Sequence, residues 1–447
     1  MMKKMNQNAW KKGVSIAAVL AMMAGTLAGC GGKAQSAAET TAAAKAAEAA
    51  SVAAADPASE SKASGTIDFY YWDSSQTDGV NAVIELFKEK NPDITVIATQ
   101  IPSSEYWTKL QTALPTGTGP DVFWMNINCS DYVEAGLLYD MTQRIEEEGI
   151  DMSMYPEFVT NLYSYDGHHY GIPKDYDGIG LFYNKEIFDE MGVEYPTDAM
   201  SWEELLELAK KVTTDEHYGF ITNTSGNSCY QNFIYSNGGR ISSADGKGCE
   251  INEAPVVEAL QYLHDMMYVH KVAPTYAELQ EMKANSMFSV GKAAMITAGS
   301  WSISTFIDAL GDNVGVCTMP VAKVPAITAN GLGYSISSKT DNLEASWEFV
   351  KFLATEEAQA ATASGAIPAY KGCDKIWADQ YAQYDAEKLL GGIYYEGSLG
   401  NPVWYGKRVE GMEVVTTAIT NIYADENADI QAILDQCDAD VEAITNQ

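Results

Sequence analysis

The feature that most constrains the fold is a regular alternation of short apolar runs with amphipathic segments. The run Ile67–Trp72 is rich in aromatic side chains, as in a β-strand. The next segment has apolar residues at the i, i+3, i+4 and i+7 spacing of a helix, namely Val80, Val83, Ile84 and Phe87. A strand over 94–98, a helix over 105–114 and a strand over 122–125 follow. Strands that alternate with helices at this spacing predict parallel pairing and an α/β fold.

The same alternation recurs in the later part of the chain. Ser201 and Glu204 form a capping box before an amphipathic segment, and Pro255 is placed as the first-turn proline of a helix that reaches about residue 271. Another helix is expected after Asn342. The folded part is roughly 380 residues long, which exceeds what one hydrophobic core usually serves, so we expect two lobes.

The amino-terminal part differs in composition from the rest. Four lysines and an apolar run over 14–27 lead to Leu27-Ala28-Gly29-Cys30, a pattern that resembles a bacterial lipoprotein signal. The run is shorter than the about 20 apolar residues that a spanning helix needs. We therefore expect residues 1–29 to be removed and Cys30 to be lipidated, which places the protein on the outer face of the cytoplasmic membrane. Residues 31–65 are mainly Ala, Ser, Thr, Glu and Lys and predict a flexible tether.

Charge and composition restrict the class of ligand. The chain has 61 acidic and 28 basic residues, a formal net charge of −33 at pH 7, which disfavours nucleic acid and anionic membrane surfaces as partners. Arginine occurs only at positions 144, 240 and 408, so an anionic ligand is disfavoured as well. The 26 tyrosines and 9 tryptophans suit stacking on, and hydrogen bonding to, a neutral polar ligand.

Cysteines and histidines suggest no metal or cofactor site. Six cysteines besides Cys30 permit disulfides outside the cytoplasm, with Cys229 and Cys249 as the best pair, although a domain of this size does not need such links. The pair His168-His169 has no further ligand at a suitable spacing. The segment 245–248 is interpreted as a hairpin turn, because the other ligands of an EF-hand are missing.

The predicted strand ends nominate the first candidate site residues. In open α/β sheets, ligands bind beyond the carboxyl ends of the strands. This rule selects Trp72, Asp73 and Ser74 after the first strand, and Asn126 and Asn128 after the strand over 122–125. An ordinary core aromatic at Trp72 and a helix cap at Asp73 are the structural alternatives.

Two carboxylates, Asp175 and Asp177, lie two residues apart before an apolar stretch over 179–183. Such a pair could supply the acid and base of a glycosidase, or could accept hydrogen bonds from sugar hydroxyls. On a strand both would face the same side. A solvated acidic turn is the structural alternative. The sequence lacks a phosphate-binding glycine loop, a nucleophile elbow and a zincin helix, which disfavours an enzyme.

Several blocks, in order, resemble the sugar-binding extracellular solute-binding proteins, similar in plan to the maltose-binding type. The blocks are Phe87–Ile94, Gly119–Trp124, Ala135–Leu138, Tyr170–Pro173 with Tyr183–Lys185, Thr197–Leu206, Phe288–Met295 with Gly299–Trp301, and Ala345–Leu353. The resemblance covers about residues 66–447. It implies a two-lobed periplasmic-binding-protein-like fold of type II, with parallel-rich sheets flanked by helices and a hinge between the lobes.

The resemblance also implies lobe boundaries and a function. The N-terminal lobe would comprise 66–175 and about 333–372, and the C-terminal lobe 178–330 and about 376–447. The protein would be a monomeric receptor, not an enzyme, which captures a neutral mono- or oligosaccharide in the interlobe cleft. It would deliver this ligand to the permease subunits of an ABC importer, held at the membrane by its lipid alone.

The resemblance further assigns individual ligand contacts. Asp177 matches a cleft acid that hydrogen-bonds sugar hydroxyls, and Trp301 and Trp404 match stacking aromatics, with Tyr405 beside the latter. The sequence departs from the maltose pattern at Ile127-Asn128, where an Asp-Arg pair is expected, and at 226–228, where an acid-Pro-Tyr element is replaced. Maltose itself is therefore not predicted.

Asparagines in the departing segments can both donate to and accept from hydroxyls, so Asn126, Asn128 and Asn227 are expected to contact a neutral sugar. Two alternatives stay open. One is a polyamine or cation receptor of the same fold, which the acidic charge favours. The other is a surface glycoside hydrolase that uses Asp175 and Asp177.

Overall fold

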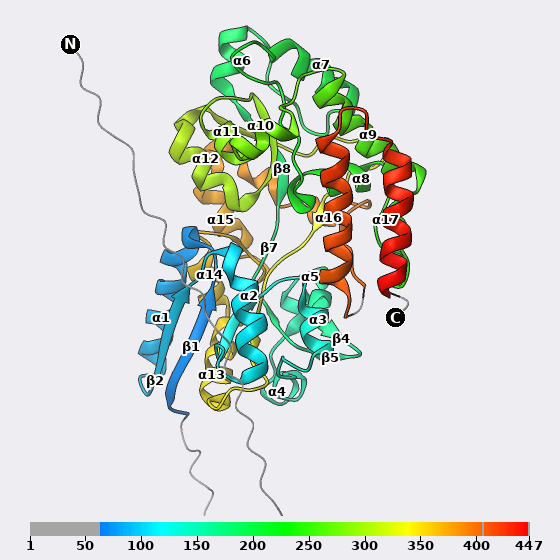
Figure 1. Cartoon of the computed structure of the whole chain (residues 1–447). Helices are drawn as coiled ribbons and strands as arrows, with labels where there is room; N and C mark the ends of the chain where they lie inside the picture. Colours follow the sequence, from blue (N-terminus) through cyan, green and yellow to red (C-terminus); the bar gives the residue numbers. More distant parts are fainter. Residues whose placement is uncertain (1–62, 405, 446–447) are drawn as a thin grey trace, which may run out of the picture. The chain divides into compact units, whose positions relative to one another are not determined.

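The larger sheet begins with the strand that follows the tether. In the computed structural model, which describes residues 63–404 and 406–445 (Figure 1), β1 (Gly65–Tyr71) pairs in parallel with β2 (Ile94–Gln100) and β3 (Val122–Met125). Helices α1 (Thr77–Lys90) and α2 (Ser103–Ala113) connect these strands. The predicted α/β alternation of this region is confirmed. The lipoprotein signal, Cys30 and residues 31–62 of the tether lie outside the described residues.

Two antiparallel strands from later segments complete this sheet. They are β12 (Gly333–Ile336) and β6 (Ile172–Pro173), which give the order β2-β1-β3-β12-β6. Helices α13 (Leu343–Leu353) and α14 (Glu356–Thr362) follow β12. Phe349 of α13 meets the rings of Phe69 and Phe87 edge-on, with centroids 5.4 and 5.0 Å apart. A late helix therefore completes the core of the first sheet.

The second sheet has β8 (Ile179–Asn184) between β9 (Met295–Gly299) and β10 (Val314–Cys317), and both neighbours are antiparallel to β8. Among the described residues, the expected parallel pairing is found in the first sheet, between the short strands β11 (Thr328–Ala329) and β14 (Leu399–Gly400), and at single bridges such as Ile221 with Ile296, but not within the second sheet. The physical reason is the chain path. β9 and β10, joined by α12 (Ile303–Leu310), run in the same direction, but β8 lies between them and runs the opposite way.

Helices surround the second sheet, and two of their start signals agree with the sequence. The capping box of Ser201 and Glu204 begins α7, and Pro255 occupies the first turn of α9. The helices of this region are α6 (Lys185–Met191), α7 (Trp202–Val212), α8 (Gln231–Ser236), α9 (Ala254–Tyr268), α10 (Tyr276–Glu281), α11 (Ala284–Ser289), α16 (Arg408–Ala424) and α17 (Ile430–Thr445). No helix among the described residues has the length and apolar character to cross a bilayer.

The remaining elements are short. They are α3 (Cys129–Glu134), α4 (Thr142–Glu148), α5 (Glu157–Leu162), β4 (Ser164–Tyr165), β5 (His168–His169), β7 (Asp175–Tyr176), β11 (Thr328–Ala329), β13 (Ile367–Pro368), α15 (Asp374–Gln380) and β14 (Leu399–Gly400). All six described cysteines are free thiols, so the disulfide considered between Cys229 and Cys249 is not formed. Cys229 is fully buried in the core, where it needs no partner.

Two neighbouring segments join the sheets. The chain leaves the first sheet at β6 and enters the second at β8, with β7 between them (Figure 1). The segment 330–332, which precedes β12, lies alongside this crossing. The Lys174 N–H donates to the Leu332 carbonyl at 2.7 Å, and the Asp177 N–H donates to the Asn330 carbonyl at 2.8 Å. Backbone hydrogen bonds thus hold the two connections together.

Tyr163 fixes this crossing to the end of β3. Its hydroxyl contacts the carbonyl oxygens of Met125 and Gly331, at 3.0 and 2.8 Å. Its ring fits between Gly171 and Gly333, where a Cβ at either glycine would come within 2.9 Å of the ring. One fully buried side chain therefore contacts the backbone at the end of β3 and next to both connections between the sheets.

We expect Tyr163→Phe to lower the free energy of unfolding by about 1–3 kcal/mol, because the buried hydroxyl proton that the carbonyl oxygens of Met125 and Gly331 share is lost. Urea denaturation measures the change. Tyr195→Phe is the matched control, since its hydroxyl contacts Asp189 on the surface, and its effect should stay within about 0.5 kcal/mol. Equal effects of the two substitutions would show that the buried contacts do not stabilise the crossing.

Candidate functional site

A cavity of about 210 Å³ lies where the two connections between the sheets, residues 174–178 and 330–332, meet the ends of several strands. We call these two connections the crossing segments. Six residues predicted from the sequence line it: Trp72, Asp73, Asn126, Asp177, Asn227 and Trp301. The other lining residues are Gln76, Asp175, Tyr176, Ser300, Asn330, Leu332 and Ala366. The cavity thus combines residues from the carboxyl ends of β1, β3 and β9 with residues of both crossing segments.

Asp177 holds two asparagines from distant segments. Its Oδ2 accepts hydrogen bonds from Nδ2 of Asn227 at 2.8 Å and from Nδ2 of Asn330 at 2.9 Å. Asn227 belongs to the single π-helical turn η4 (Gly226–Tyr230), and Asn330 follows β11 directly. Because an ionised carboxylate only accepts hydrogen bonds, it orients both amides with their NH₂ groups toward it.

The same orientation leaves two acceptors without partners. The Oδ1 atoms of Asn227 and Asn330 are buried and make no hydrogen bond within the described residues. An unsatisfied buried acceptor costs about 1–3 kcal/mol, so the site is prepared for a ligand that donates hydrogen bonds. Burial, together with the nearby carboxylate of Asp175, raises the pKa of Asp177 to about 6, although the two amides and Lys174 act in the opposite direction.

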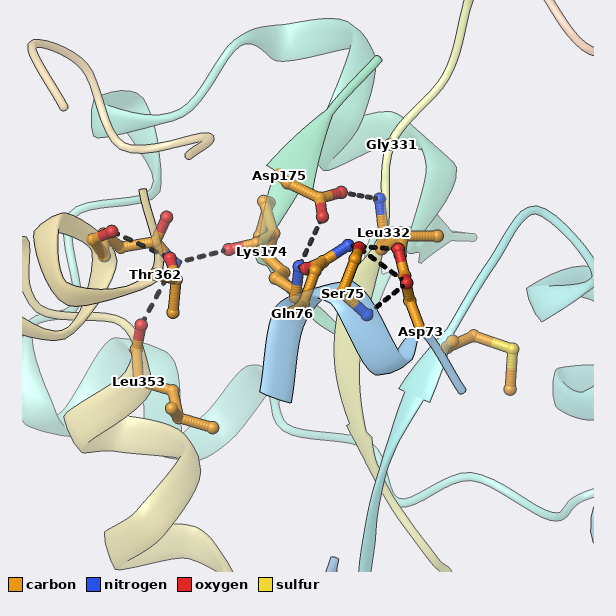
Figure 2. Close-up of polar contacts among 12 residues, drawn as sticks. Asp73, Ser75, Gln76, Lys174, Asp175, Gly331, Leu332, Leu353 and Thr362 are labelled. Carbon is orange, nitrogen blue, oxygen red and sulfur yellow. Dashed lines mark hydrogen bonds and ion pairs between the residues drawn. The ribbon is translucent and has the colours of Figure 1, made fainter. Parts of the chain in front are cut away.

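Asp175, in contrast, is engaged by the protein (Figure 2). Its Oδ2 forms an ion pair with Nζ of Lys174, and its Oδ1 accepts from the Leu332 N–H at 2.9 Å. Lys174 is 1% exposed, and its Nζ also lies 4.3 Å from the ring centroid of Trp124. The buried charge of Lys174 is therefore paired, and the two carboxylates that lie two residues apart in the sequence, Asp175 and Asp177, make different contacts.

The Lys174 network continues to the cavity wall (Figure 2). Nζ of Lys174 donates to Oε1 of Gln76 at 2.7 Å, and Nε2 of Gln76 donates to Oδ2 of Asp73 at 3.1 Å. Asp73 also accepts from the Ser75 N–H at 2.9 Å and so caps the 3₁₀ turn η1 (Ser74–Gln76). The helix cap considered for Asp73 is thus present, and Asp73 lines the cavity as well.

Two tryptophans line the cavity, Trp72 after β1 and Trp301 after β9. Trp72 packs against Tyr106 and Trp124, with centroids 4.9 and 5.3 Å apart, so it is both a packing aromatic and a cavity residue. Trp301 belongs to η5 (Ser300–Ser302), directly after β9. A Cβ on Gly299 would come within 2.0 Å of its indole, so the ring folds back over that glycine. Trp301 remains partly exposed.

The structure does not bring the other predicted residues to the cavity. Ser74 is exposed outside it. Trp404 is 1% exposed, its Nε1 donates to the Gly248 carbonyl at 2.9 Å, and its ring packs on Gly411. The ring of Trp404 therefore belongs to the core and not to the cavity wall, and stacking of Trp404 on a ligand stays a prediction. Tyr405 lies outside the described residues.

Asn128 takes part in a different contact. Its Oδ1 accepts from a guanidinium nitrogen of Arg408, at the start of α16. Asp131 of α3 accepts from the N–H groups of Arg408 and Val409, at 3.1 and 2.9 Å, and so caps α16 from another element. Asn128 therefore helps to attach α3 to α16 and does not line the 210 Å³ cavity.

Sequence reasoning missed Asn330 and Gln76 as cavity residues. A signal existed for Asn330, because it follows a short apolar run over 326–329, and the rule for strand ends would have selected it. Gln76 had no such signal, since its place depends on the distant Lys174. Among the described residues, no group of three or more His, Cys, Asp and Glu side chains could hold a metal ion, and His168 pairs with Asp140 at 2.7 Å.

Comparison with known proteins agrees with this architecture. Residues 82–387 match the family of bacterial extracellular solute-binding proteins. The chain belongs to this family. It is 25% identical to the arabinooligosaccharide-binding protein of Halalkalibacterium halodurans, over 66% of this chain and 68% of that protein. It is 26% identical to the galactooligosaccharide-binding protein of Bacillus subtilis, over 67% and 71%.

A solved structure extends the likeness to the whole fold. An ABC substrate-binding protein from Listeria monocytogenes in complex with cycloalternan has a TM-score of 0.79 and 26% identity, and covers 85% of this chain and 99% of its own. The two-lobed fold and the family expected from the sequence are confirmed. The lobe boundaries given above stay predictions.

The raised pKa of Asp177 predicts a pH-dependent stability difference. Between about pH 4 and pH 6 the unfolded chain ionises Asp177 while the folded chain keeps it protonated, so wild type loses stability as the pH rises. Asp177→Asn removes this loss. The free energy of unfolding of the variant minus that of wild type should therefore increase by about 2–3 kcal/mol from pH 4 to pH 7.

Chemical denaturation at a series of pH values measures this difference. Val269→Ala, at a side chain that is 64% exposed and has no ionisable group, is the control and should give a difference that does not change with pH. A pH-independent difference for Asp177→Asn would contradict the burial of this carboxylate.

Proposed function

We propose that this protein is a receptor that captures a neutral carbohydrate in the cavity around Asp177 and passes it to an ABC importer. The observation that carries the proposal is the pair of buried amide oxygens of Asn227 and Asn330, which lack hydrogen-bond partners. Sugar hydroxyls donate such bonds and can also accept from other groups of the wall. Trp72 and Trp301 supply aromatic surface for the apolar C–H face of a sugar ring.

The related proteins support the same class of ligand. Two curated relatives are named as binding arabino- and galactooligosaccharides, and the similar Listeria protein is in complex with cycloalternan. These ligands are neutral carbohydrates. The pairing of Asp175 with the buried Lys174 also reduces the negative charge of the wall, which favours a neutral ligand over a polyamine.

The anchoring and the delivery step belong to the proposal. Lipidation at Cys30 and the tether would hold the receptor close to its permease and raise its local concentration there. A ligand that contacts both lobes favours the closed state in proportion to its higher affinity for that state. The protein binds and releases its ligand unchanged, as a monomer.

A panel of neutral sugars tests the proposal. Arabino- and galactooligosaccharides of two to four units, their monosaccharides and spermidine are titrated while tryptophan fluorescence and the melting temperature are followed. We expect at least one sugar to bind saturably and to raise the melting temperature, without turnover. Trp301→Ala should weaken its affinity about tenfold, which corresponds to about 1.4 kcal/mol of lost stacking and contact.

The control is Val269→Ala, because this side chain is 64% exposed and does not line the cavity. It should leave the affinity unchanged. A response to spermidine with no response to any sugar would contradict the carbohydrate receptor and indicate a cation receptor. Release of shorter sugars would indicate a hydrolase.

A further inference from the structure

The short helix α8 lies behind the proposed sugar site and is buried along its whole length. Two of its polar side chains, Asn232 and Ser236, are each 0% exposed. They lie four residues apart, so they share one face of the helix. Both contact the backbone of the segment 322–328, which leads to Asn330. A buried helix thus holds the connection that carries one of the two site amides.

The side chain of Asn232 joins the two segments that bear the site asparagines. Its Nδ2 donates to the Asn227 carbonyl at 2.9 Å and to the Cys229 carbonyl at 3.3 Å. Its Oδ1 accepts from the Thr328 N–H at 2.8 Å. Because an amide donates only through its nitrogen and accepts only through its oxygen, a single orientation of Asn232 satisfies all three contacts.

The partners of Asn232 lie next to the atoms that contact Asp177. Asn227 supplies the first carbonyl itself, and Asn330 follows Thr328 by two positions in the chain. Their Nδ2 atoms lie 2.8 and 2.9 Å from the same oxygen, Oδ2 of Asp177. Since N–H···O hydrogen bonds are restricted to about 2.7–3.2 Å, both bonds require a constant spacing between the two segments.

Asn232 has no place on the cavity wall. It does not line the 210 Å³ cavity, and its side chain is fully enclosed by the core. Any effect of Asn232 on a ligand in that cavity therefore passes through the residues that it holds.

Ser236 provides a matched comparison on the same helix. Its Oγ donates to the Val324 carbonyl at 3.0 Å and accepts from the Ala322 N–H at 2.8 Å. It is as buried as Asn232 and contacts an earlier part of the same connection. Neither of its partners carries or adjoins a site amide. Loss of Ser236 should therefore weaken the core without a change at Asp177.

We propose that Asn232 is a positioning residue of the sugar site, because its amide sets the spacing at which Asn227 and Asn330 both reach Oδ2 of Asp177. This inference rests on the proposed function and extends it to a residue that the ligand does not touch. Without Asn232, at least one amide loses its contact with Asp177, and its Oδ1 acceptor loses its fixed orientation. The affinity for a ligand that donates hydrogen bonds then falls.

The carboxyl of Asp177 reports on this spacing without a ligand. Burial, together with Asp175, raises its pKa to about 6, whereas the amides of Asn227 and Asn330 and the charge of Lys174 act in the opposite direction. Loss of an amide contact should therefore raise this pKa further. The charged side chains around Asp177 are Lys174, Asp175 and, on the same cavity wall, Asp73.

The first measurement follows the free energy of unfolding from about pH 4 to about pH 8. Wild type, Asn232→Ala and Ser236→Ala are each compared with the same protein carrying Asp177→Asn. Within each pair the difference rises with pH until the folded-state pKa of Asp177 is passed. In the Asn232→Ala pair the rise should end about one pH unit higher than in wild type, because the ionised carboxyl has lost a hydrogen bond. In the Ser236→Ala pair it should end as in wild type.

The second measurement is calorimetry with galactotriose and arabinotriose. Asn232→Ala should weaken binding of the trisaccharide that wild type binds by at least about tenfold, whereas Ser236→Ala should stay within about twofold of wild type. If Asn232→Ala does not fold, Asn232→Ser replaces it, because its hydroxyl keeps one donor and one acceptor in the core. The pH at which the rise ends and the affinity should change in the same directions.

The outcomes separate this inference from the proposed function. An unchanged or lowered pKa of Asp177 in the Asn232 variant overturns the positioning role, as does an equal shift in Ser236→Ala. A raised pKa with an unchanged sugar affinity overturns the role in binding. Absence of binding to every sugar by wild type, with the pKa shift still present, instead overturns the proposed function itself.

Discussion

The site depends on one carboxylate oxygen that two asparagines share. Oδ2 of Asp177 accepts hydrogen bonds from Asn227, on the π-helical turn η4, and from Asn330, in the segment 330–332. This contact decides which end of each amide faces the protein and leaves two acceptor oxygens for a ligand. The orientation of both unpaired amide oxygens therefore follows from the position of a single side chain.

The crossing segments make this arrangement possible. The Asp177 N–H donates to the carbonyl of Asn330, so the same two residues are joined through backbone and side chain. Next to them, Lys174 and Asp175 form a buried ion pair whose remaining hydrogen bonds reach Gln76 and Leu332. Removal of one partner of such a pair is costly, because it leaves a buried charge without compensation. The connection between the lobes thus contains a buried ion pair as well as the carboxylate that the two asparagines share.

Local sequence patterns predicted the local structure well. The spacing of Val80, Val83 and Phe87 gave α1, and the capping box at Ser201 gave the start of α7, because both signals depend on residues a few positions apart. The antiparallel second sheet was not predicted, since the order of β8 between β9 and β10 depends on the path of the whole chain.

The sequence predicted only part of the candidate site, because some of its contacts also depend on the path of the whole chain. Strand ends and the family resemblance indicated Asp177, Asn227 and Trp301, which the structure brings to one cavity. Trp404 looked equivalent to Trp301 in the sequence, but it packs on Gly411 and donates to the carbonyl of Gly248, which is 156 residues away. Short-range patterns do not distinguish an aromatic ring that faces a ligand from one that distant segments cover.

The most direct test of the central claim is a crystal structure of the protein with the sugar that binds most tightly. The account predicts that hydroxyl groups of this sugar donate hydrogen bonds to Oδ1 of Asn227 and Oδ1 of Asn330, while both amides still donate to Asp177. A sugar bound outside the cavity around Asp177, with both amide oxygens still unpaired, would contradict the account.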